Sequence, residues 1–149
     1  MKALLHKVEN KEDERVIIEC VEVTPEIKDI YAYVTTKGKE LTGICEGYIK
    51  KFKLEDVYYF EATDNKVFAY TEKVVYELKA RLYEIEESYA RYHFIRGSKS
   101  MVLNLMKLDN ISPIMNGRFL ARMKNQESII ISRQYVPEMK KAIMGGRDS

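Results

Sequence analysis

The spacing of apolar residues predicts short antiparallel strands over most of the second half of the chain. Two residue pairs that favour tight hairpin turns, Asp64-Asn65 and Asn116-Gly117, each lie between two stretches rich in β-branched, aromatic or other apolar residues. A further turn is expected at residues 124–127. The strands predicted around these turns cover residues 57–62, 66–70, 111–115, 118–123 and 128–131, and two shorter apolar stretches cover residues 94–96 and 101–103.

Helical spacing of apolar residues occurs at three places. The first helix has Thr24 as its N-cap and Pro25 at its first position, and Gly38 is expected to end it. The second is expected to be capped by Thr71 and to run to about Glu87. The third is expected around Pro137, with Gly145-Gly146 at its end. The buried faces predicted for the three helices are Ile27, Ile30, Tyr31 and Val34, then Val75, Leu78, Leu82 and Ile85, then Val136, Met139 and Ile143.

The N-terminal part predicts a strand, a helix and one or two further strands. Residues 15–23 are β-branched and apolar on both sides, which is typical of a strand covered on both faces. Residues 41–53 are expected to hold the later strands. A unit of this size cannot bury such surfaces alone, so it must pack on the rest of the chain or on a second copy. The whole pattern predicts an α+β protein that is mostly antiparallel β.

Charge is distributed unevenly along a chain whose net charge is only +2. Residues 91–149 contain 11 Lys and Arg against 4 Asp and Glu, whereas residues 1–90 contain 14 against 19. A basic C-terminal part suggests a surface that binds a polyanion. An unevenly charged but merely solvated surface explains the same counts.

The sequence contains few of the patterns that are typical of an enzyme active site, a metal site or a membrane span. Cys20 and Cys45 are too far apart for a zinc knuckle, and neither His6 nor His93 has a cysteine or a second histidine nearby in the sequence. We find no glycine-rich phosphate loop and no nucleophile elbow. No stretch reaches the length of a membrane span or a signal peptide, so a cytoplasmic protein is expected. No enzyme activity, cofactor, metal or small-molecule substrate is therefore predicted.

Several ordered motifs in the second half of the chain resemble the LytTR family of DNA-binding domains. The family's opening strand is matched by LEDVYYFEA at residues 54–62, and its central signature by FIRGSKSMVLN at residues 94–104. The Asn-Gly hairpin follows at residues 116–118, and the family's closing motif is matched by ISRQYVPEMK at residues 131–140. The resemblance implies a mostly β DNA-binding domain over residues 54–146, preceded by an extension over residues 1–53.

The family reads DNA with loops placed in the major groove, so the resemblance also implies which residues contact DNA. Three family contact positions fall on Ser98, Asn125 and Arg133. Ser98 and Lys99 stand where the family usually has His-Arg, which implies a different target sequence or a loop that mainly holds phosphate. Further phosphate contacts are expected from Arg118, Arg122 and Lys124, of which the two arginines should share one face of their strand.

Each carried-over residue also has a purely structural interpretation. Arg133 can pair with guanine through two hydrogen bonds, but it can equally cap carbonyl groups at a strand end. Asn125 suits a turn through its tolerance of left-handed backbone, and this role is compatible with a base contact. Ser98 can be a loop residue that touches nothing.

The sequence thus predicts a sequence-specific regulator of transcription that binds double-stranded DNA as a homodimer. Only about 53 residues precede the resemblance, too few for the receiver domain that many family members carry. Regulators of this short type often work with a small membrane protein, so such a partner is a further expectation. Two alternatives remain open: a protein-interaction module whose basic sheet meets an acidic partner, and a small hydrolase with a concave site.

Overall fold

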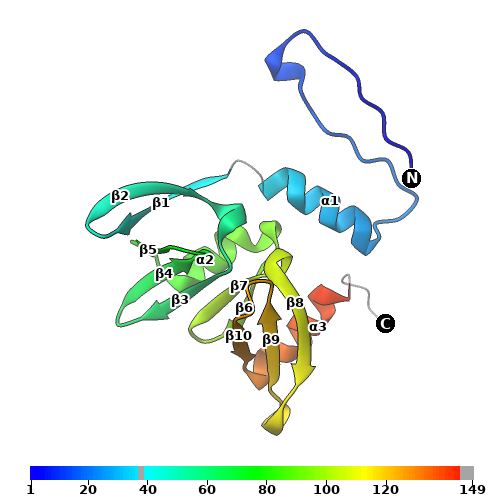
Figure 1. Ribbon diagram of the computed structural model, residues 1–149. Helices are drawn as coiled ribbons and strands as arrows, with labels where there is room; N and C mark the ends of the chain where they lie inside the picture. The colour runs from blue at the N-terminus through cyan, green and yellow to red at the C-terminus, as the bar shows by residue number, and fades with distance from the viewer. Residues whose placement is uncertain (37–38, 145–149) are drawn as a thin grey trace.

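A computed structural model describes residues 1–36 and 39–144 of the chain (Figure 1). Its strands form two antiparallel sheets, one with the order β2-β1-β5-β4-β3-β7-β6 and one with the order β10-β9-β8. The α+β, mostly antiparallel fold is therefore as predicted. The strands of the larger sheet are β1 (Glu40–Cys45), β2 (Tyr48–Lys53), β3 (Tyr59–Thr63), β4 (Lys66–Tyr70), β5 (Val75–Leu78), β6 (Phe94–Ser98) and β7 (Met101–Asn104). The smaller sheet contains β8 (Leu108–Pro113), β9 (Phe119–Met123) and β10 (Ser128–Ile131).

Both hairpins predicted from turn residues are present. Asp64 and Asn65 have φ values of 50° and 62° between β3 and β4, and Asn116 and Gly117 have values of 65° and 74° between β8 and β9. Two successive left-handed residues give a turn whose twist matches that of the flanking strands. The turn at residues 124–127 also connects its two expected strands, β9 and β10.

The three helices are α1 (Pro25–Thr36), α2 (Leu82–Tyr89) and α3 (Val136–Ile143). The first begins as predicted, with the Thr24 hydroxyl accepting a hydrogen bond of 3.3 Å from the Ile27 amide. The third covers the predicted positions, and Val136 and Met139 are buried in it. Gly38 and Gly145-Gly146, expected to end two of the helices, lie outside the described residues.

The helix predicted from Thr71 onwards is wrong in its first half. Thr71 caps a turn instead: its hydroxyl accepts from the Val74 amide at 3.1 Å and donates to the Val74 carbonyl at 2.8 Å. Residues 75–78 then form β5, which pairs with both β4 and β1, and the helix begins only at Leu82. Backbone pairing on both sides and stacking of Tyr76 on Phe52, with ring centroids 4.1 Å apart, favour the strand over the helix that the spacing allowed.

The strand predicted over residues 15–23 is not formed in the structure. These residues belong to no helix or strand of the described chain, the backbone bends at residues 21 and 22, and most of their side chains are exposed. A β-branched sequence favours extended backbone, but a strand exists only when a neighbouring strand accepts its hydrogen bonds. The N-terminal segment instead leads outward from α1, on the upper side of the molecule in Figure 1.

Two hydrophobic clusters hold the sheets and helices together. One fills the space between the larger sheet and α2 and includes Phe60, Leu54 and Val57, each fully buried. The other joins the larger sheet to the smaller sheet and α3 through Leu103, Met123 and other buried side chains. The motif residue Asn104 is buried between them, where its amide donates to the Val57 carbonyl at 2.8 Å and its side-chain oxygen accepts from the Met106 amide at 3.0 Å. The hydrogen bonds of Asn104 connect the segment before β3 with the turn after β7, and the second cluster holds the two sheets together.

Candidate nucleic-acid interface

Several turns from distant parts of the sequence meet along one edge of the molecule. The Ala62 amide, beside the β3–β4 turn, donates to the Ser100 carbonyl in the β6–β7 turn at 2.8 Å. The Ser132 amide, just after β10, donates to the Gly97 carbonyl in β6 at 2.9 Å. Figure 1 shows the β3–β4, β6–β7 and β8–β9 turns on the lower side of the molecule, away from the N-terminal segment. We call the four cationic residues at these turns, Lys66, Lys99, Arg118 and Arg133, the basic rim.

Arg133 and the β8–β9 turn are in direct contact. A β-carbon placed on Gly117 would lie 2.7 Å from Cδ of Arg133, so the aliphatic part of the arginine lies over the glycine. Arg133 is exposed and forms no ion pair among the described residues. Neighbouring Arg118 is half-buried, and its Nε donates to the Met115 carbonyl at 3.2 Å. The guanidinium group of Arg133 is therefore held at the surface and remains available to a ligand.

The β6–β7 turn is held in place by Arg96. Its Nη1 donates to the Lys99 carbonyl at 2.6 Å, and its Nε donates to the Glu86 carboxylate of α2 at 3.0 Å. Within the turn, the Ser98 hydroxyl accepts from the Ser100 amide at 3.2 Å. The main chain at Lys99 is thus fixed from two sides, while its side chain points into solvent with no ion pair in the described part of the chain.

The other predicted contact residues lie at the opposite end of the smaller sheet. Arg122, Lys124 and Asn125 belong to the end of β9 and the turn after it, whereas Arg133 follows β10 beside the start of β9. Five strand residues separate the two groups by ~17 Å, at about 3.4 Å per residue. Arg122 is exposed opposite the buried Ala121. Arg118 precedes β9 and is half-buried, so the two arginines lie at opposite ends of this strand, and the shared face expected for them stays a prediction.

The turn after β9 is internally hydrogen-bonded. The Asn125 side-chain oxygen accepts from the Glu127 amide at 3.1 Å, and its nitrogen donates to the Glu127 carboxylate at the same distance. Glu127 also accepts from the Tyr59 hydroxyl at 2.9 Å. Burial, followed by that hydrogen bond, raises the pKa of Tyr59 well above its ordinary value. Asn125 therefore has a turn role through its side-chain hydrogen bonds, but the left-handed residue of this turn is Gln126, at φ 76°, and not Asn125.

Sequence reasoning missed two contributors to this edge. Lys66 joins the rim because β3 pairs with β7, which brings the β3–β4 turn beside the β6–β7 turn. Lys66 is half exposed and lies 3.6 Å from Glu77. Arg96 holds the Lys99 turn, although only its place in the FIR motif marked it in the sequence. No local pattern reveals either role, because both depend on which strands are neighbours.

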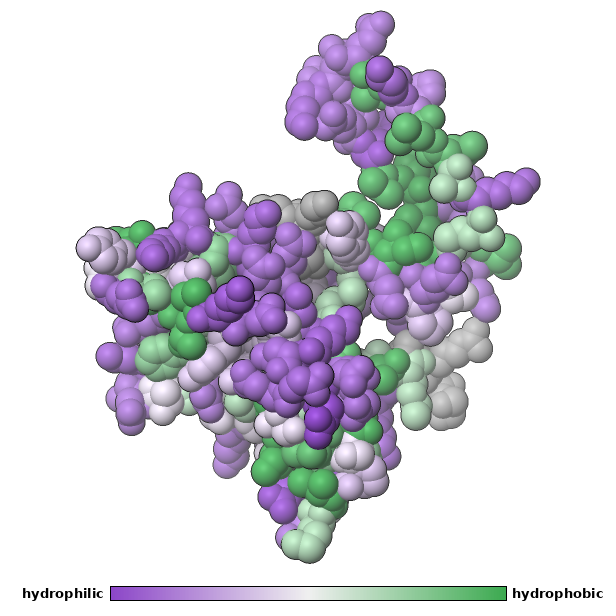
Figure 2. Space-filling view, in the orientation of Figure 1, coloured by the Kyte–Doolittle hydropathy of each residue, from purple (hydrophilic) through white to green (hydrophobic). Residues whose placement is uncertain are grey.

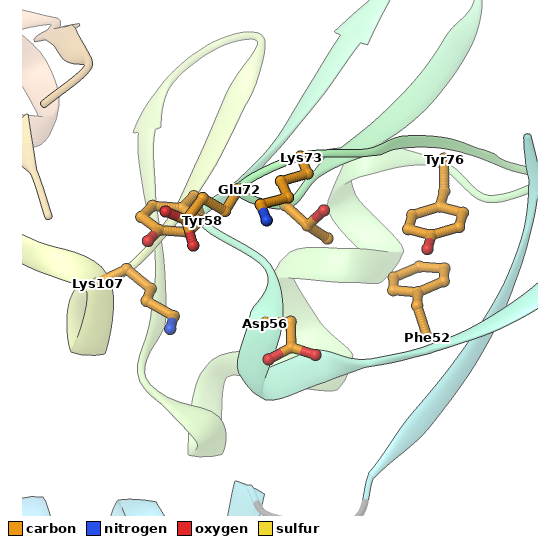
Figure 3. A pocket seen from close by; sticks show the side chains of 8 residues that line it. Phe52, Asp56, Tyr58, Glu72, Lys73, Tyr76 and Lys107 are labelled. Carbon is orange, nitrogen blue, oxygen red and sulfur yellow. The ribbon is translucent and has the colours of Figure 1, made fainter. Parts of the chain in front are cut away.

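A hollow of about 230 Å³ lies at the other end of β3 from the rim (Figure 3). Figure 3 shows Tyr58, Glu72 and Lys107 on one side of it and the stacked pair Phe52 and Tyr76 on the other. Its lining contains two carboxylates and two lysines and no histidine or cysteine. Burial, followed by the nearby carboxylates of Glu72 and Asp56, raises the pKa of the Tyr58 hydroxyl. A lining with balanced charge and no activated nucleophile gives no support to a hydrolase.

Residues 1–36 and 39–144 contain no cluster of three or more His, Cys, Asp or Glu side chains placed to hold a metal ion. In the same part of the chain, no helix is long and apolar enough to cross a membrane.

Known proteins resemble this chain over the region that contains the rim. Residues 47–144 match the family model described as the LytTr DNA-binding domain. Over 107 residues the chain is 30% identical to an uncharacterized HTH-type transcriptional regulator of Staphylococcus aureus (strain NCTC 8325 / PS 47), with 72% of each chain covered. Over 110 residues it is 27% identical to the transcriptional regulatory protein YpdB of Escherichia coli (strain K12), covering 73% of this chain but only 45% of YpdB.

A solved structure shares the fold. The LytTr DNA-binding domain of a response regulator from Bacillus cereus superposes with a TM-score of 0.66 at 25% sequence identity, covering 72% of this chain and 97% of that domain. Nearly the whole of that domain therefore has a structural counterpart in this chain.

Proposed function

Since the chain belongs to the LytTR family of DNA-binding domains, we propose that it regulates transcription by binding specific sequences in double-stranded DNA through its basic rim. The observation that carries this proposal is the convergence of turns from three hairpins and the end of β10 on one edge, with Arg133 exposed over Gly117. Turns that project from a rigid sheet can enter the major groove, which is about 12 Å wide.

Within this proposal, Arg133 reads a base and the lysines hold the backbone. Arginine pairs with O6 and N7 of guanine through two hydrogen bonds, a contact that discriminates between bases. Lys66 and Lys99 provide charge without that planar geometry, so they contribute to affinity for any sequence. Ser98 uses its hydroxyl within the turn, and its role is to shape the loop beside Lys99.

The residues at the far end of β9 meet the same duplex further along its axis. The ~17 Å between the two groups is about half of a helical turn of B-DNA, which rises roughly 34 Å. When the rim faces a major groove, Arg122, Lys124 and Asn125 face the next minor groove and the phosphates that flank it. The cationic side chains of Arg122 and Lys124 and the side-chain amide of Asn125 are suited to contacts with this groove and its phosphates.

The test is selection of bound sites from a random duplex pool with wild type, Arg133→Ala and Lys99→Ala. We expect Arg133→Ala to lose about 1–3 kcal/mol on the best site and to relax preference at one position. Lys99→Ala, the matched control, should weaken binding to all duplexes about equally. An unchanged sequence preference in Arg133→Ala contradicts its role as base reader. Failure of the wild type to select any sequence favours a protein-interaction module instead.

A further inference from the structure

The N-terminal segment has a sequence typical of a strand but no partner strand. Residues 14–23 are rich in β-branched side chains and form no helix, yet they pair with no strand in the described chain, and the backbone bends at residues 21 and 22. Ile17 is 64% exposed and Val21 is fully exposed, which is unusual for side chains of this type. Figure 2 shows apolar side chains gathered on the upper right of the molecule, where this segment and α1 lie. Both the backbone and these side chains require a partner that the single chain does not supply.

The larger sheet ends in an exposed strand that carries positive charge. β2 is its edge and carries Lys50, Lys51 and Lys53 with no acidic residue. Its apolar residues Tyr48 and Ile49 are 68% and 78% exposed. An exposed edge presents unpaired amides and carbonyls, which accept an added strand.

Charge and packing favour β2 over the other edges. Residues 14–23 contain three glutamates and one arginine, and Glu14 is ion-paired with Lys11, so the segment has a net negative charge that complements the lysines of β2. The opposite edge, β6, is covered by β10 and α3. The free edge of the smaller sheet, β8, contains Asp109 and ends in a proline, which removes a backbone donor.

The geometry points to a second copy of the chain as the source of the strand. In the single chain α1 packs against the turn at residues 90–92, with Ile27 and Ala32 buried, and it directs the segment away from β2. To reach its own β2 the segment would have to return along the ~18 Å of the 12-residue helix.

We propose that residues 14–23 of each copy add as an edge strand to β2 of the other copy. The exchange is reciprocal, so it closes as a two-fold dimer. Each copy would cover its exposed Ile17 and Val21 and satisfy the backbone of both the segment and β2. The dimer would hold two basic rims, although the proposed exchange does not depend on what those rims bind.

The test uses charge reversal in the full chain, followed by analytical ultracentrifugation. One variant is Glu19→Lys and the other is Lys50→Glu with Lys51→Glu. Neighbouring lysines on a strand face opposite sides, so the pair covers either register of the added strand. All three residues are exposed, and circular dichroism checks that each variant keeps its secondary structure.

We expect the wild type to be a dimer and each variant to dimerise at least tenfold more weakly. A 1:1 mixture of the two variants should restore dimers, because the lysine at position 19 then meets the acidic edge and the unchanged acidic segment meets the unchanged lysine edge. An arrangement within one chain cannot be rescued by mixing. A monomeric wild type at all concentrations would overturn the proposal, as would a dimer that the variants do not weaken or that the mixture does not restore.

Discussion

The side chain of Arg133 lies across Gly117. A β-carbon on Gly117 would stand 2.7 Å from Cδ and 3.0 Å from Cγ of the arginine, closer than packed carbon atoms allow. Two parts of the chain that were predicted separately, the Asn-Gly hairpin and the arginine after the last strand, are thus one unit. The turn forms the surface on which the proposed base-reading side chain lies.

Replacing Gly117 should therefore move Arg133. Gly117→Ala introduces the clashing methyl group at a residue whose φ is +74°. We expect a stability loss of about 1 kcal/mol from the strained backbone and, from the displaced arginine, roughly tenfold weaker binding to the selected DNA site. Thermal unfolding and fluorescence anisotropy measure the two effects.

Gly47→Ala is the control for this substitution. Gly47 has a φ of +82°, but a β-carbon there would have no atom within 4 Å. It should show a similar loss of stability with unchanged DNA affinity. Equal weakening by both variants would mean that backbone strain, and not the position of Arg133, sets the affinity.

A second prediction concerns Arg96, whose hydrogen bonds connect Glu86 of α2 to the turn at Lys99. Glu86→Gln removes the charge that holds the Arg96 guanidinium, so the turn should become less ordered. Because Glu86 is 42% exposed, we expect a stability loss below about 1 kcal/mol but a several-fold loss of DNA affinity. Glu87→Gln changes the same charge one residue away, at an exposed position. Identical affinities for the two variants would exclude this positioning role.

Binding to DNA should depend steeply on salt. Each phosphate neutralised by a rim cation releases counterions and adds about −0.9 to the slope of log affinity against log salt concentration. Several such contacts imply a fall of on the order of tenfold to a thousandfold between low and physiological salt. Lys99→Ala should make the slope less steep by about 0.9, the contribution of one phosphate contact. A flat titration would count against DNA binding altogether.

The stability of the fold should fall at mildly acidic pH because of His93. Burial lowers the pKa of this half-buried imidazole below its ordinary 6.5; Asp29 acts in the opposite direction and Lys28 in the same one. The unfolded chain therefore binds a proton more readily, and stability is lost as pH decreases from 6.5 through the folded pKa.

His93→Asn removes this titration while tolerating the left-handed backbone at φ 70°. We expect its free energy of unfolding to change less between pH 7 and pH 5 than that of the wild type, as measured by urea denaturation. His6→Asn, at an exposed position, should behave like the wild type. A wild-type curve that is equally shallow would show that His93 binds its proton as readily in the folded protein as in the unfolded chain, contrary to this prediction.

Elements specified by neighbouring residues were predictable from the sequence. The turns at Asp64-Asn65 and Asn116-Gly117 need left-handed backbone that few residues accept, and Thr24-Pro25 defines a helix start in two residues. The strand β5 was not predictable, because Val75 and Leu78 also fit a helical face. Only pairing with β1 and β4, at positions remote in the sequence, favours the strand.

The candidate site was predicted as a set of residues but not as an arrangement. Ser98, Arg118 and Arg133 meet on one edge, whereas Asn125 lies at the far end of β9. The grouping follows from the order of strands in the sheets, which no short motif encodes. For the same reason the sequence did not indicate that Lys66 joins the rim.

The residues proposed for DNA recognition differ from those that stabilise the fold. Ser98, Lys99 and Arg133 lie outside both hydrophobic clusters, while Leu103 of the same motif packs between the sheets and Asn104 is buried and hydrogen-bonded to Val57. An exposed side chain such as Lys99 can therefore change with little effect on the core. A regulator of the proposed kind could follow mutations in its promoters, and the Ser98-Lys99 pair, expected from the resemblance to stand in place of His-Arg, is a change that such a scaffold would tolerate.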